Sequence, residues 1–100
     1  MDNACRRALA VMADVSGMEP DTMRGPSRDY AVTMARAIVM DWLCGHFDFT
    51  ASEIGAMFSG RDRETVRNSI LRMENARMAG DRDTRTWHKW FNLIIREYYG

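Results

Sequence analysis

Hydrophobic residues recur at intervals of three and four along most of this chain, and no run of β-branched residues alternates with polar ones. The first such stripe predicts a helix over residues 3–16, with Ala8, Val11, Met12 and Val15 on one face. Gly17 follows directly and suits the left-handed position that commonly ends a helix. The pattern therefore predicts an all-α fold.

Three further stretches continue the helical pattern. Pro20 stands near the start of a short second helix over residues 19–23. After Gly25-Pro26-Ser27, we expect a longer helix that begins at Ser27 or Arg28 and runs to about Cys44. A last helix is expected near residues 84–98. In it we expect Trp87, Trp90 and Phe91 to belong to the core rather than to stack on single-stranded bases, and we expect the nine methionines to fill the core.

The stretch from residue 50 to about residue 78 has the pattern of a helix-turn-helix. Thr50-Ala51-Ser52-Glu53 is a capping box, which predicts a helix start. That helix ends after Phe58, because Gly60 follows. Asp62 is suited to cap a second helix with Val66, Ile70 and Met73 on one face. Two helices joined by so short a turn, the second opening with polar and basic residues, are typical of DNA-binding helix-turn-helix motifs.

The charge is unevenly distributed although its sum is zero, with 14 basic and 14 acidic side chains. Residues 1–60 carry five basic and eight acidic side chains, whereas residues 61–90 carry eight basic and five acidic ones. All basic residues except Lys89 are arginine, whose guanidinium fork fits phosphate oxygens and guanine edges. The helix-turn-helix region therefore has a positive bias that suits nucleic acid.

Several classes of protein are not expected from this sequence. One hundred residues make one domain, which we take as residues 1–100, and no apolar run is long enough to span a membrane. Neither His46 nor His88 has partners at a metal-ligand spacing, and no nucleophile with a base can be placed. We therefore expect no enzyme, cofactor or metal. We expect Cys5 and Cys44 to be free thiols in the cytoplasm, with a disulfide as the alternative.

The residues from Thr50 to Val66 contain the string E-I-G-x-x-F-x-G-R-D-x-x-T-V. This string resembles the C-terminal DNA-binding domain of the bacterial replication initiator DnaA. The resemblance implies a six-helix, Trp-repressor-like domain that binds double-stranded DNA. It also implies that the helix over about residues 62–70 enters the major groove, while the loop before the long helix reaches the adjacent minor groove.

Carried over by position, the resemblance assigns DNA contacts residue by residue. The start of the groove-reading helix holds Arg61, Asp62, Arg63, Glu64 and Thr65. Arg28 takes the place of the minor-groove arginine, with Arg24 in the same basic loop, and Arg36 that of a backbone-contacting arginine. Arg67 lies one turn after Arg63 on the same face.

Alternatives stay open for five of these residues, and for Arg63 and Arg67 the alternative is ordinary solvation of an exposed helix face. Arg61 could instead pair with Asp62 or Glu64, Asp62 could serve only as a cap, and Glu64 could either accept from cytosine or repel phosphate.

Two departures from the family bear on function. Arg63-Glu64 replaces the family's usual His-Thr pair, so we expect a target other than the usual initiator box. The chain has no G-x-x-x-x-G-K-[ST] loop, so we expect a stand-alone small protein without ATP-driven assembly. The hypothesis is a sequence-specific DNA-binding regulator of replication or transcription, on the nucleoid of a bacterium or phage-infected cell. The alternative is a derived protein-interaction module that docks a replication protein. Acidic side chains between the arginines would favour that alternative.

Overall fold

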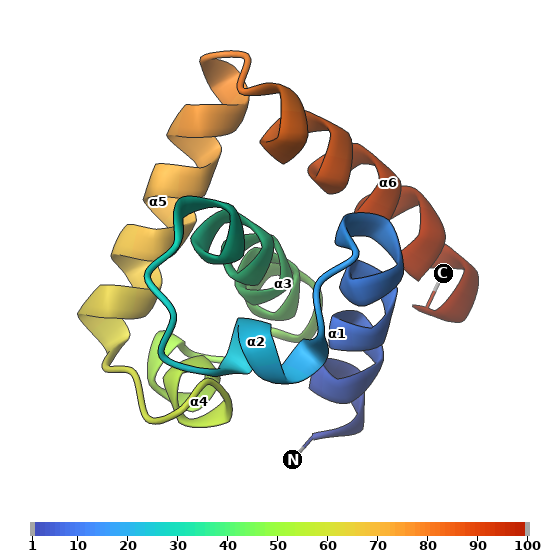
Figure 1. Cartoon of the computed structure of the whole chain (residues 1–100). Coiled ribbons are helices and arrows are strands. Elements are labelled where there is room, and N and C mark those ends of the chain that lie inside the picture. Colours follow the sequence, from blue (N-terminus) through green and yellow to red (C-terminus); the bar gives the residue numbers. More distant parts are fainter. Residues whose placement is uncertain (1, 100) are drawn as a thin grey trace.

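The computed structural model describes residues 2–99, and all of their regular structure is helical (Figure 1). The six helices are α1 (Asn3–Ser16), α2 (Pro20–Arg24), α3 (Tyr30–Phe47), α4 (Ala51–Met57), α5 (Arg63–Met78) and α6 (Arg82–Tyr99). The all-α, six-helix prediction is confirmed. None of the described helices is long and apolar enough to cross a membrane.

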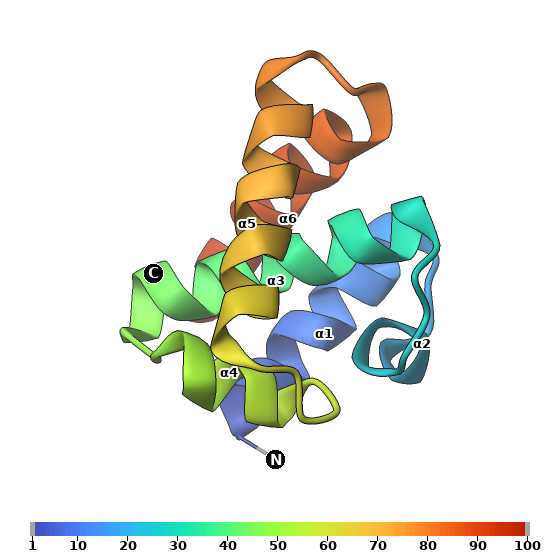
Figure 2. The same cartoon turned by 90° about the vertical axis from the view of Figure 1, so that its left-hand side faces the viewer.

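Helix α3 is the centre of the fold. Its residues from Val32 to Met40 are all buried, as is Leu43, so it is enclosed on most sides by the other helices. Helices α1 and α6 pack on one side of α3, and α4 and α5 pack on the other. Figure 2 shows α5 crossing in front of α3, with the loop that joins α2 to α3 lying to the side of α5. Residues of this loop and of α5 line one groove.

Local signals in the sequence set several helix ends as predicted. Gly17 ends α1 in the left-handed conformation, with φ at 77°. At the start of α4, the amide of Glu53 donates to the Thr50 hydroxyl over 3.1 Å, and the Thr50 amide donates to the Glu53 carboxylate over 2.8 Å. The predicted capping box is therefore present, and it satisfies two amides that the helix itself leaves free.

The long helix begins later than predicted, at Tyr30 rather than at Ser27 or Arg28. Asp29 is its cap, because the Asp29 carboxylate accepts from the amide of Ala31 over 3.0 Å. The Ser27 hydroxyl accepts only from the amide of Asp29, over 3.2 Å, and so shapes the preceding turn. Arg28 consequently lies in the loop, outside α3.

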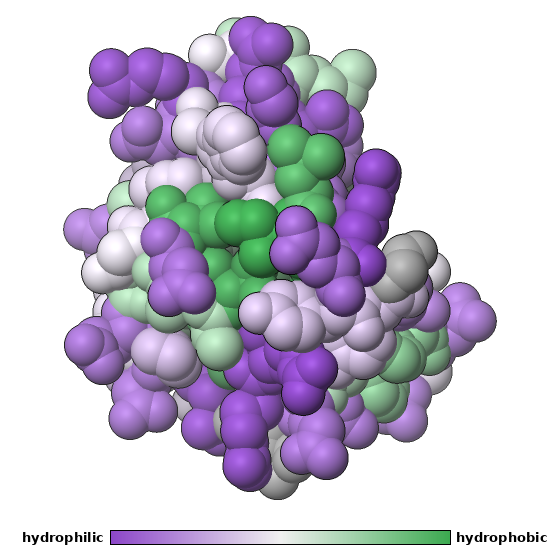
Figure 3. Space-filling view, turned by 90° about the vertical axis from the view of Figure 1, so that its right-hand side faces the viewer, coloured by the Kyte–Doolittle hydropathy of each residue, from purple (hydrophilic) through white to green (hydrophobic). Residues whose placement is uncertain are grey.

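Trp90 and Met78 are exposed, so the prediction that they belong to the core is wrong. Trp90 is 49% exposed and Met78 is 78% exposed, whereas Phe91 is fully buried and Trp87 is partly buried. The buried stripe of α6 runs through Thr84, Phe91 and Ile95, and Trp90 lies about 100° away from Phe91 around the helix. Figure 3 shows the face on which α1 and α6 lie, where hydrophobic residues gather in the middle among hydrophilic ones.

Both cysteines are free thiols, as predicted. Cys5 is buried and Cys44 is exposed. Burial raises the pKa of the Cys5 thiol to about 11, so Cys5 behaves as a small apolar side chain at neutral pH.

Candidate nucleic-acid interface

The turn between α4 and α5 depends on close approach at Gly55. A Cβ built on Gly55 would lie 1.8 Å from the carbonyl oxygen of Arg61, so no other residue fits without moving the backbone. The amide of Arg61 donates to the Gly55 carbonyl over 3.0 Å. Ser59 and Gly60 have φ values of 62° and 71°, which complete the reversal. The turn thus returns the chain tightly onto α4 before α5 begins.

The Arg61 side chain joins this turn to the loop between α2 and α3. Its Nη1 donates to the Phe58 carbonyl over 2.7 Å, and its Nη2 donates to the Gly25 carbonyl over 2.6 Å. It makes no ion pair with Asp62 or Glu64, which was the alternative interpretation of the sequence. Burial lowers the pKa of the Arg61 guanidinium. Arg61 therefore links two segments 36 residues apart.

The buried Arg36 side chain also donates hydrogen bonds to the segment that joins α2 to α3. The residue is only 3% exposed, and its Nε donates to the carbonyl of Met23 over 2.6 Å. Its Nη2 donates to the carbonyls of Gly25 and Ser27 over 3.1 and 2.9 Å. Burial, and after it the charge of Arg61, lowers the pKa of Arg36 to about 10. The backbone contact with DNA that the resemblance implies for Arg36 stays a prediction.

Arg24 also faces the helix-turn-helix. Its Nε donates to the Met57 carbonyl over 3.3 Å, and its own carbonyl accepts from the Ser59 hydroxyl. Arg24, Arg36 and Arg61 thus fix the position of the loop relative to α4 and to the start of α5. We call these three residues the inner arginines.

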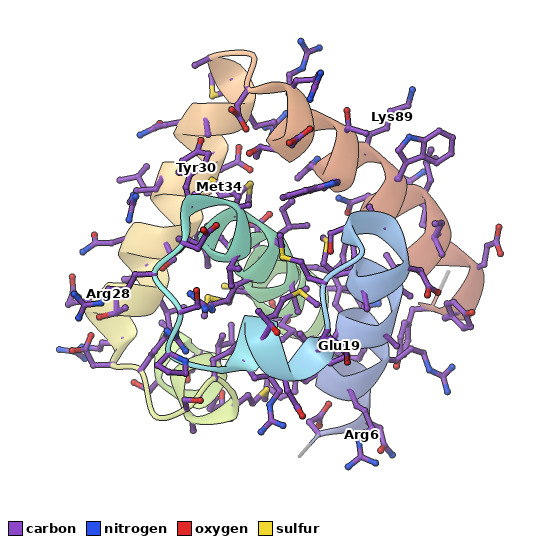
Figure 4. All side chains as sticks on the ribbon, viewed as in Figure 1. Arg6, Glu19, Arg28, Tyr30, Met34 and Lys89 are labelled. Carbon is purple, nitrogen blue, oxygen red and sulfur yellow. The ribbon has the colours of Figure 1, made fainter. Side chains whose placement is uncertain are left out.

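A groove of about 530 Å³ lies between the loop and α5. Figure 4 shows Arg28 reaching outward from the loop across the N-terminal half of α5. None of the lining residues is acidic. They are Pro26, Ser27, Arg28, Thr33, Arg36, Ser59, Gly60, Arg61, Thr65, Ser69 and Arg72. The groove therefore combines four guanidinium groups with five hydroxyl groups.

The outer face of α5 carries a mixture of charges. Arg63, Glu64 and Arg67 are exposed, and Nη1 of Arg67 lies 2.8 Å from Oε1 of Glu64. Such an exposed pair contributes little to stability, so either side chain is free to turn to another partner. Asp62 caps α5, because its carboxylate accepts from the amide of Thr65 over 2.8 Å, and this bond lowers the pKa of Asp62.

Two groove residues on α5 were not predicted from the sequence. Ser69 and Arg72 follow Thr65 by four and seven positions, so the three residues share one face of α5. This polar stripe is visible in the sequence once the start of α5 is known. The sequence did not predict DNA contacts along this stripe, because the resemblance places the contacts at the first turn of the helix.

The fold and the interface define an all-α helix-turn-helix protein of the DNA-binding class. The family model described as the bacterial DnaA protein helix-turn-helix matches residues 6–72, and the chain belongs to that family. A relative is the chromosomal replication initiator protein DnaA of Picosynechococcus sp., which is 33% identical over 58 residues. The match covers 58% of this chain but 13% of that initiator. The resemblance inferred from residues 50–66 is thereby confirmed.

Proposed function

We propose that this protein binds double-stranded DNA at specific sequences. In the proposed complex, α5 enters the major groove with its N-terminal end, and the loop over residues 25–29 meets the adjacent minor groove. The observation that carries the proposal is the groove between loop and helix, which is lined by arginines and hydroxyls without an acidic side chain. The family supports the same conclusion, because it is a DNA-binding helix-turn-helix family.

The groove is suited to the sugar-phosphate strand that separates the two DNA grooves. Arg28 and Arg72 supply charge at its two walls, and Thr65 and Ser69 offer hydroxyl donors along α5. The N-terminal end of α5 adds the partial positive charge of the helix dipole. These contacts would position the protein and give most of its salt-dependent affinity.

Base contacts are assigned to the first turn of α5. Arg63 is exposed there and would donate to O6 and N7 of guanine. Glu64 would accept from N4 of cytosine after leaving Arg67, which is then free to contact phosphate. We therefore infer a target richer in G·C at these steps than one read by His and Thr.

The biological role that fits this activity is regulation of replication or transcription at specific sites on the nucleoid. The proposed activity needs neither catalysis nor a cofactor. The matched family is a DNA-binding domain family rather than a catalytic one.

The proposal is tested by fluorescence anisotropy of labelled duplexes, after selection of preferred sites from random sequence. Each neutralised phosphate contributes about 0.9 to the slope of log affinity against log salt, so a handful of contacts predicts a slope of roughly −3 to −5. Selection should recover a defined site with G·C pairs at the steps read by Arg63 and Glu64.

A flat salt response, or no binding at low salt, would contradict DNA binding. It would instead favour the interaction module, for which the exposed Trp90, Leu93 and Tyr98 of α6 offer the contact area. Salt-dependent binding without any selected site would support DNA binding but contradict specificity.

A further inference from the structure

A second polar cluster lies where α3, α5 and α6 meet, away from the groove. It consists of Asp41, Glu74 and His88, one residue from each helix. One carboxylate oxygen of each acid and one ring nitrogen of His88 all lie within 4.8 Å of one another, and all three residues are half-buried. Spacing in the sequence does not reveal this cluster, because its members are 33 and 14 positions apart.

The cluster is incompletely satisfied by the protein itself. Among residues 2–99, no side-chain hydrogen bond involves the Asp41 carboxylate or the His88 ring, whereas Oε2 of Glu74 accepts from Nη2 of Arg77 over 2.7 Å. The buried Nε of the same Arg77 has no partner. A buried nitrogen without a partner, such as this one, costs free energy. Burial and the nearby Glu74 charge accordingly raise the pKa of Asp41.

One imidazole nitrogen and two carboxylate oxygens form a donor set that suits Zn²⁺. A neutral imidazole offers one ring nitrogen lone pair to a metal ion. Zinc bonds to such donors are about 2.0–2.2 Å long, so donor atoms around one ion lie roughly 3.3–3.5 Å apart. Small rotations of the three side chains would bring them to that separation.

Arg77 places a positive charge beside the cluster. Its bond uses Oε2 of Glu74, and no side-chain hydrogen bond within residues 2–99 involves Oε1. Two ionised carboxylates and one guanidinium leave these three groups with a net charge of about −1, which attracts a cation.

We propose that Asp41, Glu74 and His88 bind one Zn²⁺ ion, with water in the remaining position. The ion ties α6 to α3 and α5. Glu74 lies eleven residues after the start of α5, which is about 16 Å along the helix, so the site is separate from the proposed DNA-reading end. Glu74 and His88 also lie outside residues 6–72, the part of the chain that matches the family.

The test uses chelator-treated full-length protein and zinc chloride. Calorimetric titration should show one ion per chain. A hundredfold excess over Kd should raise the unfolding temperature by roughly 10 °C, because the ion binds only the folded state. His88→Gln and Asp41→Asn should each weaken zinc binding at least tenfold. Co²⁺ should give the visible absorption of a four-coordinate site, and Mg²⁺ at the same concentration should not raise the unfolding temperature.

The matched control combines His46→Gln with Cys44→Ser. Both residues are exposed on α3 and neither belongs to the cluster. His46 stacks on Trp42, and the two ring centroids are 5.1 Å from each other. This control should bind zinc like the parent. Absence of one-to-one zinc binding would overturn the proposal. So would equal affinity in His88→Gln and the parent, or loss of binding in the control alone. If His88→Gln fails to fold by circular dichroism, Asp41→Asn and Glu74→Gln decide by the same measurements.

Discussion

The inner arginines and the exposed arginines beside them differ in what their guanidinium groups contact. Arg36 and Arg61 donate to backbone carbonyls of the loop and the turn, and Arg36 is almost completely buried. Arg28, Arg63 and Arg72 are exposed, and no hydrogen bond or ion pair within residues 2–99 occupies their guanidinium groups. We call these three the outer arginines.

Under the proposed function, one residue type serves two separate tasks within one interface. Backbone carbonyls of an irregular loop need donors, and a buried guanidinium supplies several in a fixed geometry. The same group on the surface keeps its donors for phosphate or base edges. We therefore expect that loss of an inner arginine lowers stability first, whereas loss of an outer arginine lowers DNA affinity alone.

The largest expected effect follows from Arg36→Met. The substitution leaves the carbonyls of Met23 and Ser27 without their donor, and the Gly25 carbonyl keeps only its bond from Arg61, so we expect the free energy of unfolding to fall by about 3–5 kcal/mol. Urea unfolding followed by circular dichroism measures it. Arg72→Met is the matched control on the surface and should stay within about 0.5 kcal/mol of the parent. Equal stability of the two variants would remove the distinction between inner and outer arginines.

Arg63→Ala should act on specificity and leave stability unchanged. Loss of one paired guanine contact reduces discrimination at one or two adjacent base pairs by about 1–3 kcal/mol.

Glu64→Thr should act differently from Arg63→Ala, because it removes a negative charge. Non-specific binding should strengthen and the preferred base should change. Site selection with the parent and both variants separates these outcomes. An unchanged base preference in Glu64→Thr would mean that Glu64 faces solvent in the complex.

A smaller effect is expected for Arg61→Lys. Lysine keeps the charge but cannot donate to the Phe58 and Gly25 carbonyls at once, so we expect a loss of about 1 kcal/mol in unfolding free energy. Thermal unfolding provides the measurement. Any fall in DNA affinity should come only from the loop becoming less ordered. A lysine variant with parental stability but much weaker DNA binding would move Arg61 to the outer group.

The parts of this structure that the sequence predicts are those set by local signals. Gly17, the Thr50 capping box and Asp62 act within a few residues, and each sets a helix end where expected. Burial depends on residues far along the chain. The sequence does not show that Arg36 faces a loop before α3 or that Trp90 lies beside the buried stripe of α6.

The proposed DNA interface and the proposed zinc site also differ in how far local sequence reveals their residues. Thr65 and the first turn of α5 could be assigned by resemblance, because the family string is contiguous from residue 53 to residue 66. Arg28 was assigned by its place in the loop before the long helix. Ser69 and Arg72 needed the position of α5. The convergence of Asp41, Glu74 and His88 needed the packing of three helices, which no local pattern encodes.

The central claim is that the outer arginines meet DNA while the inner ones build the loop that presents them. The most direct measurement compares the salt dependence of DNA binding in the parent and in a variant with Arg28→Gln and Arg72→Gln. Two lost phosphate contacts should reduce the steepness of the log–log slope by about 1.8, while the unfolding free energy stays within about 0.5 kcal/mol. Arg82→Gln, an exposed arginine at the start of α6, should leave the slope unchanged. A parental slope in the double variant would contradict the account.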